Sequence, residues 1–456
     1  MSNWYLKEIS DLSLDENKTK IISSKSTVVI LAYLIEQEQI CPVCYKSNYS
    51  KNGHIMKIIK DASQLRRLII IKLNIQRYIC KECGNSFYED NPYTNPYELL
   101  TKESIVCIMH SLLYDNATYE SVAREMHLSR QTIMKVFDRY YEYNKGELPE
   151  ILSFDEKSNN DRNTKSPYIF IIVDFMKHKI YDILPSRYKI SLNKYFSKYS
   201  EQVRKKVKYV TMDMWDSYRD VAKCQFKNAI IAVDSFHVME NLNRAMTKIR
   251  VSIMQKYNEK TENIIDNSTN YYLLKKYHYF FTKEFDDITD KSIFIPKEHV
   301  HLSKHKLLEK LLKIDPRLDK AYKLVSKYRE FNKTCRYENA REELEDLIEL
   351  FANSNEIVFE EFAATLTNWK DEIINSFITV KDHYSDGEEY NRRLSNGLIE
   401  GLNSTIARLQ MNARGYSNYW RMRNRIIYVV NKDYTLNDDD PKPIEIKNRI
   451  KTNKKK

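Results

Sequence analysis

The sequence lacks the segments that would place it in or across a membrane. It contains no uninterrupted apolar run of about 18 residues, the length that a membrane-spanning helix needs. Residues Met1 to Asp15 carry acidic side chains and lack the basic start and apolar core of a secretory signal. We therefore expect no membrane partner and a cytoplasmic location.

Cysteine is scarce and acidic residues are outnumbered. Seven cysteines in 456 residues of a cytosolic protein favour metal binding or free thiols over disulfides. The 74 Lys and Arg residues against 63 Asp and Glu give a net charge of +11. Without an amphipathic basic helix for a membrane surface, this charge favours nucleic acid as the partner, although many other proteins are equally basic.

Four of the cysteines form two C-x-x-C knuckles. Cys41 and Cys44 make the first, Cys80 and Cys83 make the second, and 35 residues separate the two. Apolar strands are predicted at 68–73 and 76–79, leading directly into the second knuckle. The spacing predicts a zinc ribbon with one structural Zn²⁺ held by four thiolates, and the alternative is four unrelated buried thiols.

The period of apolar residues becomes helical from Thr101 to Tyr143, with breaks near 115–116 and 127–129. Thr118 and Ser129 are predicted caps of the second and third helices. The third helix should bury one apolar face and leave three polar side chains outward for DNA, namely Arg130, Gln131 and Lys135. This pattern predicts a helix-turn-helix, and the alternative is a plain three-helix packing unit.

Strands and helices are mixed beyond Gly146. The predicted order is three strands, helix, strand, helix, strand, and residues from about Ala245 to Asp386 are predicted to be almost wholly helical, with another helix from Tyr390. The predicted class is therefore α+β multidomain. The predicted segments are a zinc-ribbon DNA-binding domain (1–95), a helix-turn-helix (100–147), a first core part (148–244), a helical insertion (245–386), a last core part (387–436) and a basic tail (437–456), with disorder expected from Pro441 onward.

Four predicted strands end in an aspartate: Asp155, Asp174, Asp213 and Asp234. If the first three strands form a meander, Asp174 lies at the opposite edge of the sheet from Asp155. The strand ending at Asp213 follows a helical crossover and can lie parallel beside the first strand. Asp155 and Asp213 should then meet at one edge, where two carboxylates repel each other unless a divalent cation lies between them.

The third acid should come from a helix beside that edge. Between Asn391 and Arg425 there are seven arginines and one acidic residue, Glu400. A helical wheel places Glu400 in a polar row with Asn396 and Asn403, opposite a stripe of leucine and isoleucine. A lone carboxylate on a basic, amide-rich face is suited to share a metal near DNA phosphates. The alternative, a surface glutamate, is equally compatible with the pattern.

Four segments resemble the catalytic signatures of the ISL-three family of insertion-sequence transposases. They are Ser153–Glu156 (SFDE), Thr211–Trp215 (TMDMW), Ser395–Ser404 (SNGLIEGLNS) and Ala413–Tyr416 (ARGY). The resemblance extends to the ribbon and the helix-turn-helix, and leaves out the helical insertion and the tail. Asp234 and His237 resemble an Asp-x-x-His element that follows the second acid in several DDE superfamilies; His237 could instead be a helix-start histidine satisfied by Asp234.

The resemblance implies an RNase H-like core in which Asp155, Asp213 and Glu400 form a DDE triad that holds Mg²⁺ or Mn²⁺. The protein would then be a prokaryotic, nucleoid-associated DNA transposase that binds the ends of its insertion sequence and catalyses strand cleavage and strand transfer. The expected partners are double-stranded DNA, as terminal inverted repeats and target, and further copies of the chain in a synaptic complex. Arg408 and Arg414 are expected to join the third helix in binding DNA.

Two alternatives remain open. In the first, the protein is a transposase-derived, sequence-specific DNA-binding regulator in which the acids no longer act. The intact triad argues against this interpretation. In the second, it is a nuclease with an RNase H-like core that does not transpose. That function would leave the ribbon and the helix-turn-helix without a purpose.

Overall fold

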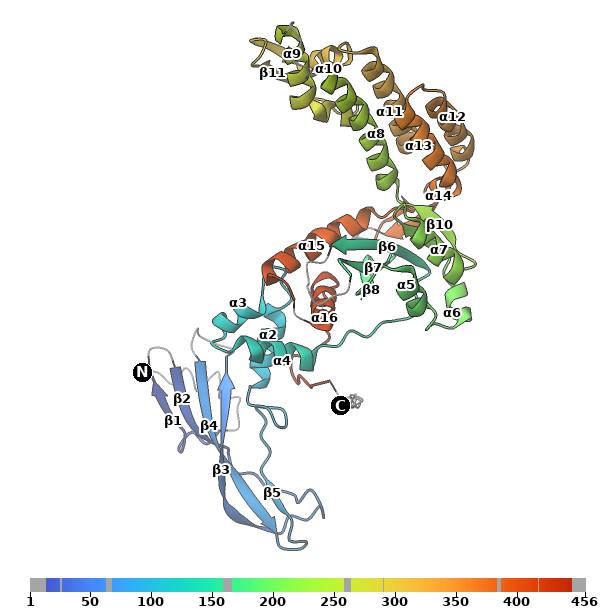
Figure 1. The fold of residues 1–456 in the computed structure, drawn as a ribbon. Helices are drawn as coiled ribbons and strands as arrows, with labels where there is room; N and C mark the ends of the chain where they lie inside the picture. Colours follow the sequence, from blue (N-terminus) through green and yellow to red (C-terminus); the bar gives the residue numbers. More distant parts are fainter. Residues whose placement is uncertain are drawn as a thin grey trace, which may run out of the picture. The chain divides into compact units, whose positions relative to one another are not determined.

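A computed structural model describes residues 14–24, 27–62, 68–158, 166–257, 264–289, 291–383, 387–416 and 418–444. The side chains at positions 68, 264–268, 398 and 400 lie outside the described set. The chain forms two compact units, one from Met1–Asn144 and Ser404–Lys456, the other from Lys145–Asn160 and Thr164–Asn403. Together the two units confirm the predicted α+β class (Figure 1).

The first unit opens with a sheet of order β1-β2-β4-β3, in which β5 also pairs with β4. Its strands are β1 (Lys20–Ser23), β2 (Thr27–Tyr33), β3 (Tyr49–Asp61), β4 (Leu68–Cys80) and β5 (Ser86–Tyr88). Two separate strands at 68–73 and 76–79 were predicted, but β4 is continuous. Ile71, Leu73 and Ile75 are all buried, so the alternation of a single strand continues through the expected break.

Three helices follow: α2 (Lys102–Ser111), α3 (Tyr119–Glu125) and α4 (Arg130–Tyr140). The predicted caps are confirmed, since the Thr118 hydroxyl accepts from the Ser121 N–H and the Ser129 hydroxyl accepts from the Thr132 N–H. The buried face of α4 is also as predicted and comprises Ile133, Val136, Phe137 and Tyr140. Local sequence therefore determines where these helices begin and which side they bury.

Two later helices complete this unit: the second part of α15 (Gly397–Ala413) and all of α16 (Tyr419–Val430). The Arg425 side chain of α16 is 1% exposed and donates to the backbone carbonyls of Leu112, Tyr114 and Ala117. The Tyr428 hydroxyl donates to the Met109 carbonyl at 2.8 Å. The predicted segment 387–436 is thus divided between the two units at Asn403.

The start of the predicted tail packs against the same helices, and the Ile444 N–H donates to the Arg139 carbonyl at 3.0 Å, which corrects the expectation of disorder for 441–444. Asp438 pairs with His110 at 3.0 Å, and Asp440 pairs with Lys102 at 2.7 Å. The Asn95 amide donates to the Pro441 carbonyl at 2.6 Å. The prediction rested on the excess of basic residues from Pro441 onward, which does not record contacts with distant helices. Residues 445–456 lie outside the described set.

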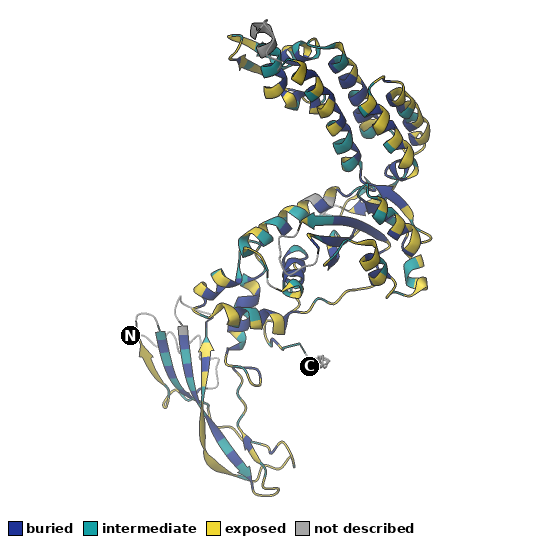
Figure 2. Cartoon of the chain, viewed as in Figure 1, coloured by how far each residue is buried: buried dark blue, intermediate teal, exposed yellow. Residues whose placement is uncertain are grey.

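The second unit contains a sheet of order β10-β9-β6-β7-β8. Its elements are β6 (Ile151–Ser158), β7 (Tyr168–Asp174), β8 (Lys179–Leu184), α5 (Lys189–Phe196), α6 (Glu201–Lys205), β9 (Tyr209–Met212), α7 (Asp216–Gln225) and β10 (Ile230–Val233). The predicted order of strands and helices is confirmed, as is the antiparallel meander of β6, β7 and β8. Strands β6, β7 and β8 are mostly buried (Figure 2).

The segment after β10 is mostly helical, as predicted, with two exceptions. Its helices are α8 (Ser235–Lys256), α9 (Ile264–Lys276), the 3-10 helix η1 (His278–Thr282), α10 (Lys304–Leu312), α11 (Pro316–Thr334), α12 (Ala340–Ala352), α13 (Ile357–Asn368) and α14 (Lys370–Asn375). One exception is the hairpin of β11 (Ser292–Ile295) and β12 (Val300–Ser303). Helix α8 begins directly after Asp234, so the predicted boundary at 245 falls inside a helix.

The second exception is the hairpin of β13 (Thr379–His383) and β14 (Glu389–Arg393). A helix was predicted from Tyr390, but this residue pairs in register with Asp382. Asp382 also binds His178 at 2.9 Å and Arg392 at 2.9 Å, which ties the hairpin to the turn between β7 and β8. Burial opposes ionisation of Asp382, but Arg392 and His178 lower its pKa to about 2. The helix therefore starts later, at Gly397.

Candidate functional site

Two aspartates lie side by side on adjacent parallel strands. Strands β6 and β9 pair in parallel, with Leu152 opposite Val210 and Ser153 opposite Thr211. Asp155 lies two residues after Ser153, and Asp213 lies two residues after Thr211. The two carboxylates therefore come to the same edge of the sheet, as the sequence predicted. One detail differs, because β6 continues to Ser158 and Asp155 therefore does not end its strand.

The Asp155 carboxylate is buried beside a second acid. Burial raises the pKa of Asp155 and the charge of Asp213 raises it further, to about 7. Two N–H groups oppose this shift: the Glu156 backbone N–H donates to Oδ1 at 2.6 Å, and the Asn403 amide donates to Oδ2 at 2.6 Å. The site therefore holds negative charge at a cost in free energy that a bound cation would offset.

The second aspartate, Asp213, is in contact with His237. The Nε2 atom of His237 is 2.9 Å from Asp213 Oδ1. Burial alone would lower the pKa of His237, but the hydrogen bond and charge of Asp213, with those of the nearby Asp234 and Asp155, raise it to about 9. The imidazole is therefore protonated at neutral pH. Asp213, Asp234 and His237 offer ligand atoms within 4.8 Å of one another, and His237 would have to lose its proton to share a metal ion with the two acids.

Asp234 and Asp174 have structural partners. Asp234 caps α8, accepts from the Asn396 N–H at 3.3 Å, and has a pKa raised by burial. Asp174 pairs in register with Leu152, three residues before Asp155, and accepts from the backbone N–H groups of the next turn. The prediction that Asp174 is a poor partner of Asp155 is therefore confirmed.

Asn396 connects three segments that are far apart in sequence. Its amide nitrogen donates to the Phe154 carbonyl at 2.9 Å and to Asp213 Oδ1 at 3.4 Å. Its amide oxygen accepts from the Thr211 hydroxyl at 2.5 Å. Leu394 and Asn396 precede α15, so the predicted stripe and polar row lie only partly on a helix. The sequence pointed to Asn396 as polar, but nothing local indicated this bridging position.

The third predicted acid, Glu400, occupies the first turn of α15. Its side chain lies outside the described set, so its place relative to Asp155 and Asp213 stays a prediction. One turn later in the same helix, Asn403 contacts Asp155. The helix on which the prediction placed Glu400 is therefore the helix that reaches the first acid.

A cavity of about 340 Å³ opens beside Asp213 and His237. Arg187 lines it, forms an ion pair with Glu156, and lies over the Trp215 ring at 4.6 Å from the centroid. Sequence reasoning missed Arg187, since it lies in a loop after β8 and no pattern marks it. A cation and an aromatic face beside a carboxylate pair are groups that contact a nucleotide.

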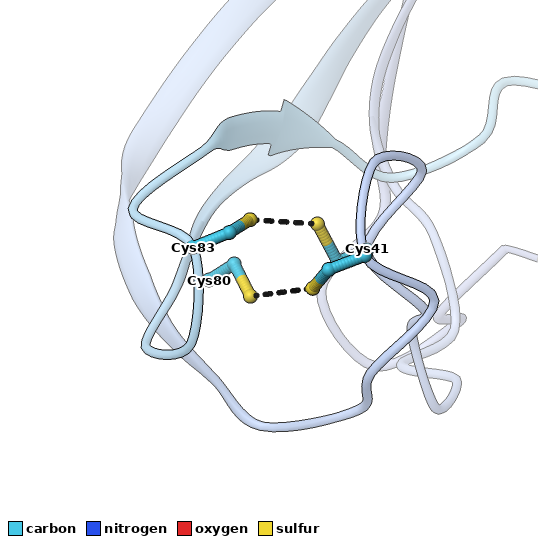
Figure 3. Close-up of side chains that lie close together, drawn as sticks. Cys41, Cys80 and Cys83 are labelled. Atoms are coloured by element: carbon cyan, nitrogen blue, oxygen red, sulfur yellow. Dashed lines mark hydrogen bonds between the residues drawn. The ribbon is translucent and has the colours of Figure 1, made fainter.

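The four predicted zinc ligands come together in the first unit. Their sulfur atoms all lie within 4.8 Å of one another, with Cys41 3.6 Å from Cys83 and Cys44 3.4 Å from Cys80. Figure 3 shows Cys41 facing Cys80 and Cys83 from a separate loop. The Cys44 backbone N–H points at the Cys41 sulfur and lowers its pKa to about 6. Four sulfurs at these distances could bind a zinc ion.

The two knuckles repeat one backbone pattern. The Tyr45 N–H donates to the Cys41 carbonyl at 2.9 Å, and the Gly84 N–H donates to the Cys80 carbonyl at 3.0 Å. In each knuckle the residue that follows the second cysteine has a positive φ, which is 58° for Tyr45 and 73° for Gly84. Glycine adopts this conformation without strain, whereas tyrosine does not. The repeated turn orients each pair of sulfurs toward the other pair.

The predicted DNA-binding residues all lie in the first unit. Arg130, Gln131 and Lys135 are exposed on α4, as predicted. Arg130 and Arg414 line a common cavity of about 600 Å³, together with Arg124. Arg408 is different, because it forms an ion pair with Asp115 at 2.7 Å. Arg421 and Arg425 line the same cavity, but Arg421 pairs with Asp138 and Arg425 donates to backbone carbonyls. Five arginines and one acid, Glu120, therefore surround this cavity.

A comparison with known families decides the identity. The family model of the ISL-three DDE transposases, described as "Transposase", matches residues 152–426. The chain is a transposase of this family. The match includes both aspartates, the hairpin that precedes α15 and the first two thirds of α16. A search of curated proteins gave no match.

Membership of this family implies DNA as the partner and a divalent metal at the catalytic site. The residues of the transposase fit such an ion: two adjacent carboxylates, one of them buried, repel each other, and the buried Asn403 oxygen beside them has no hydrogen-bond partner among the described residues. No described helix of the transposase is long and apolar enough to cross a membrane.

Proposed function

We propose that this transposase binds the ends of its own insertion sequence and catalyses DNA strand cleavage and strand transfer through Asp155, Asp213 and Glu400. The observation that carries the proposal is the parallel pairing of β6 and β9, which places Asp155 beside Asp213. The sheet order β10-β9-β6-β7-β8, a meander extended by two parallel strands, supports an RNase H-like core. Residues 148–244 and the start of 387–436 would form it.

Asp155, Asp213 and Glu400 would hold Mg²⁺ or Mn²⁺. When bound, such ions activate the attacking water or 3′-hydroxyl and stabilise the leaving oxygen of an in-line displacement. The carboxylates would hold these ions against the reacting phosphodiester. His237 keeps a proton on the nitrogen next to Asp213 and offsets part of the negative charge that a DNA phosphate must approach. Arg187 adds a second positive group at the wall of the same cavity.

DNA-end binding would belong to the zinc ribbon and the helix-turn-helix. Helix α4 presents Arg130, Gln131 and Lys135 outward, as a recognition helix does. Arg414 and Arg124 extend this positive surface around the shared cavity. Replacing one side chain that binds a phosphate should make the slope of log K against log salt shallower by about one unit. A synaptic complex would require at least two copies of the chain.

The test is a paired assay of strand cleavage and gel-shift binding on DNA that carries the element's ends. We expect Asp155→Asn, Asp213→Asn and Glu400→Gln to lose cleavage by at least a hundredfold while binding persists. Asp174→Asn is the matched control, because this acid lies in the same sheet away from Asp155. Full cleavage by Glu400→Gln would show that the third acid is assigned wrongly.

A further inference from the structure

Buried polar atoms without a partner are rare in folded proteins, and one of them lies at the catalytic site. Among the described residues, five buried side-chain atoms have no hydrogen-bond partner: the hydroxyls of Tyr93, Tyr119 and Tyr277, Gln410 Nε2 and Asn403 Oδ1. Only Asn403 among these five contacts a predicted catalytic acid. An acceptor oxygen left unpaired beside a carboxylate needs an electropositive partner.

The contacts of Asn403 define where its oxygen lies. Its amide nitrogen donates to Asp155 Oδ2 at 2.6 Å. The amide oxygen is bonded to the same carbon as that nitrogen, so it lies next to the Asp155 carboxylate. Amide and carboxylate oxygens are both ligands of hard divalent cations. A cation held by Asp155 would therefore find a neutral oxygen within reach.

Asn396 provides an internal comparison, because it also contacts a catalytic acid through an amide. Both polar atoms of its amide have partners: the nitrogen donates to the Phe154 carbonyl, and the oxygen accepts from the Thr211 hydroxyl. Asn396 therefore has a structural role that uses its whole amide. Asn403 uses only half of its amide, since its nitrogen is paired and its oxygen is not. The difference singles out the Asn403 oxygen.

The position of Asn403 in its helix agrees with this role. Glu400 and Asn403 are three residues apart in α15, and positions with this spacing share one helix face. The same helix face thus carries an acid and an amide, and the amide contacts Asp155. A neutral fourth oxygen adds a ligand without adding to the repulsion between the carboxylates.

We propose that Asn403 supplies a neutral oxygen ligand to the divalent cation held by Asp155, Asp213 and Glu400. The proposal rests on the proposed catalytic function. It adds to the triad a ligand that is not an acid. It also explains why one amide at the site is fully paired and the other is not.

The test is metal binding by the full-length, zinc-loaded protein without DNA. Mn²⁺ affinity is measured by the loss of the free-ion electron paramagnetic resonance signal. We expect Asn403→Leu to weaken binding by about tenfold or more, and Asn403→Asp, which keeps an oxygen, to bind at least as tightly as the parent. Asn228→Leu, at an exposed asparagine, should leave the affinity unchanged. If the leucine variant does not fold, Asn403→Asp tests the proposal alone, and Mn²⁺ binding weaker than that of the parent would contradict it.

A second readout separates ligation from positioning. The luminescence lifetime of bound Tb³⁺ in H₂O and D₂O counts the water molecules on the ion, and Asn403→Leu should add about one. Weaker binding with an unchanged water count would overturn the proposal and make Asn403 a positioning residue. Unchanged affinity in Asn403→Leu, with loss of binding in Asp155→Asn, would also overturn it and leave the proposed function standing. Unchanged binding in Asp155→Asn would overturn both.

Discussion

At the candidate site, three groups have raised pKa values: Asp155, Asp234 and His237. The folded pKa of Asp155, about 7, exceeds its ordinary value of 3.8, so the folded chain binds this proton more tightly than the unfolded chain. Stability then falls as pH rises from about 4 to about 7. The pKa of His237, raised from 6.5 to about 9, contributes stability that is present below pH 6.5 and lost as pH rises through 9. Both effects act in the same direction.

We therefore expect Asp155→Asn to stabilise the protein at pH 8 when no divalent ion is added. The gain should be on the order of 2–4 kcal/mol at pH 8 and small at pH 4, because the amide removes the buried charge. Thermal unfolding of zinc-loaded protein at both pH values measures it. Asp371→Asn, at a side chain 71% exposed, is the control. A variant no more stable than the parent at pH 8 would contradict the conclusion that the buried charge of Asp155 destabilises the folded protein.

Asn396 is the residue whose loss should damage the fold of the site most. Asn396→Leu keeps the number of side-chain heavy atoms but removes the hydrogen bond to the Phe154 carbonyl and the one from the Thr211 hydroxyl, which retains only its contact with Ser153. We expect a loss of about 2–4 kcal/mol in the free energy of unfolding by urea. Asn228→Leu should change it by less than about 0.5 kcal/mol. Equal effects of the two substitutions would mean that the bridging hydrogen bonds do not stabilise the site.

At the scale of elements, the sequence predicted what local chemistry determines. Thr118 and Ser129 cap helices because their own hydroxyls reach a backbone N–H three residues later, and the register of β6 and β9 follows from a parallel crossover. Strand β14 was mistaken for a helix because its conformation depends on pairing with β13. The bridging place of Asn396 depends on three distant segments, which no local pattern records.

The two cysteine knuckles should act as one element. We expect the purified protein to contain about one zinc ion per chain and Cys80→Ser to lose it, since three remaining thiolates leave the tetrahedral site open. Cys224→Ser, at an exposed cysteine outside both knuckles, should keep the ion. Elemental analysis of the three proteins decides the matter. Zinc retained by Cys80→Ser would mean that the four sulfurs do not form the site.

At the scale of the whole molecule, the three-helix group α2 to α4 is not complete in the N-terminal sequence. Its core includes Tyr428 of α16, whose ring lies 5.4 Å from that of Phe137 and 4.7 Å from that of Tyr141. Arg425 satisfies three backbone carbonyls near the end of α2. A chain cut after Asn144 would expose these aromatic rings to water and leave the carbonyls without their donor.

We therefore expect the fragment Met1–Asn144 to have an ordered zinc ribbon and unstable helices α2 to α4. Hydrogen exchange should show weak protection in 102–140 of the fragment and strong protection in the full chain. Adding residues 404–444 as a separate peptide should restore part of this protection, and a scrambled peptide of the same composition should not. Strong protection in the fragment alone would mean that α16 is dispensable for this fold.

The long helical segment between β10 and β13 leaves and rejoins the catalytic sheet at one edge. Helix α8 starts directly after β10, and at the far end the Asn375 amide of α14 donates to the Ile231 carbonyl of β10 at 2.9 Å. The ends of the segment are therefore held together by the same strand. Since lengthening a loop whose ends are already fixed costs little entropy, this segment can change in length during evolution while the spacing of Asp155 and Asp213 is preserved.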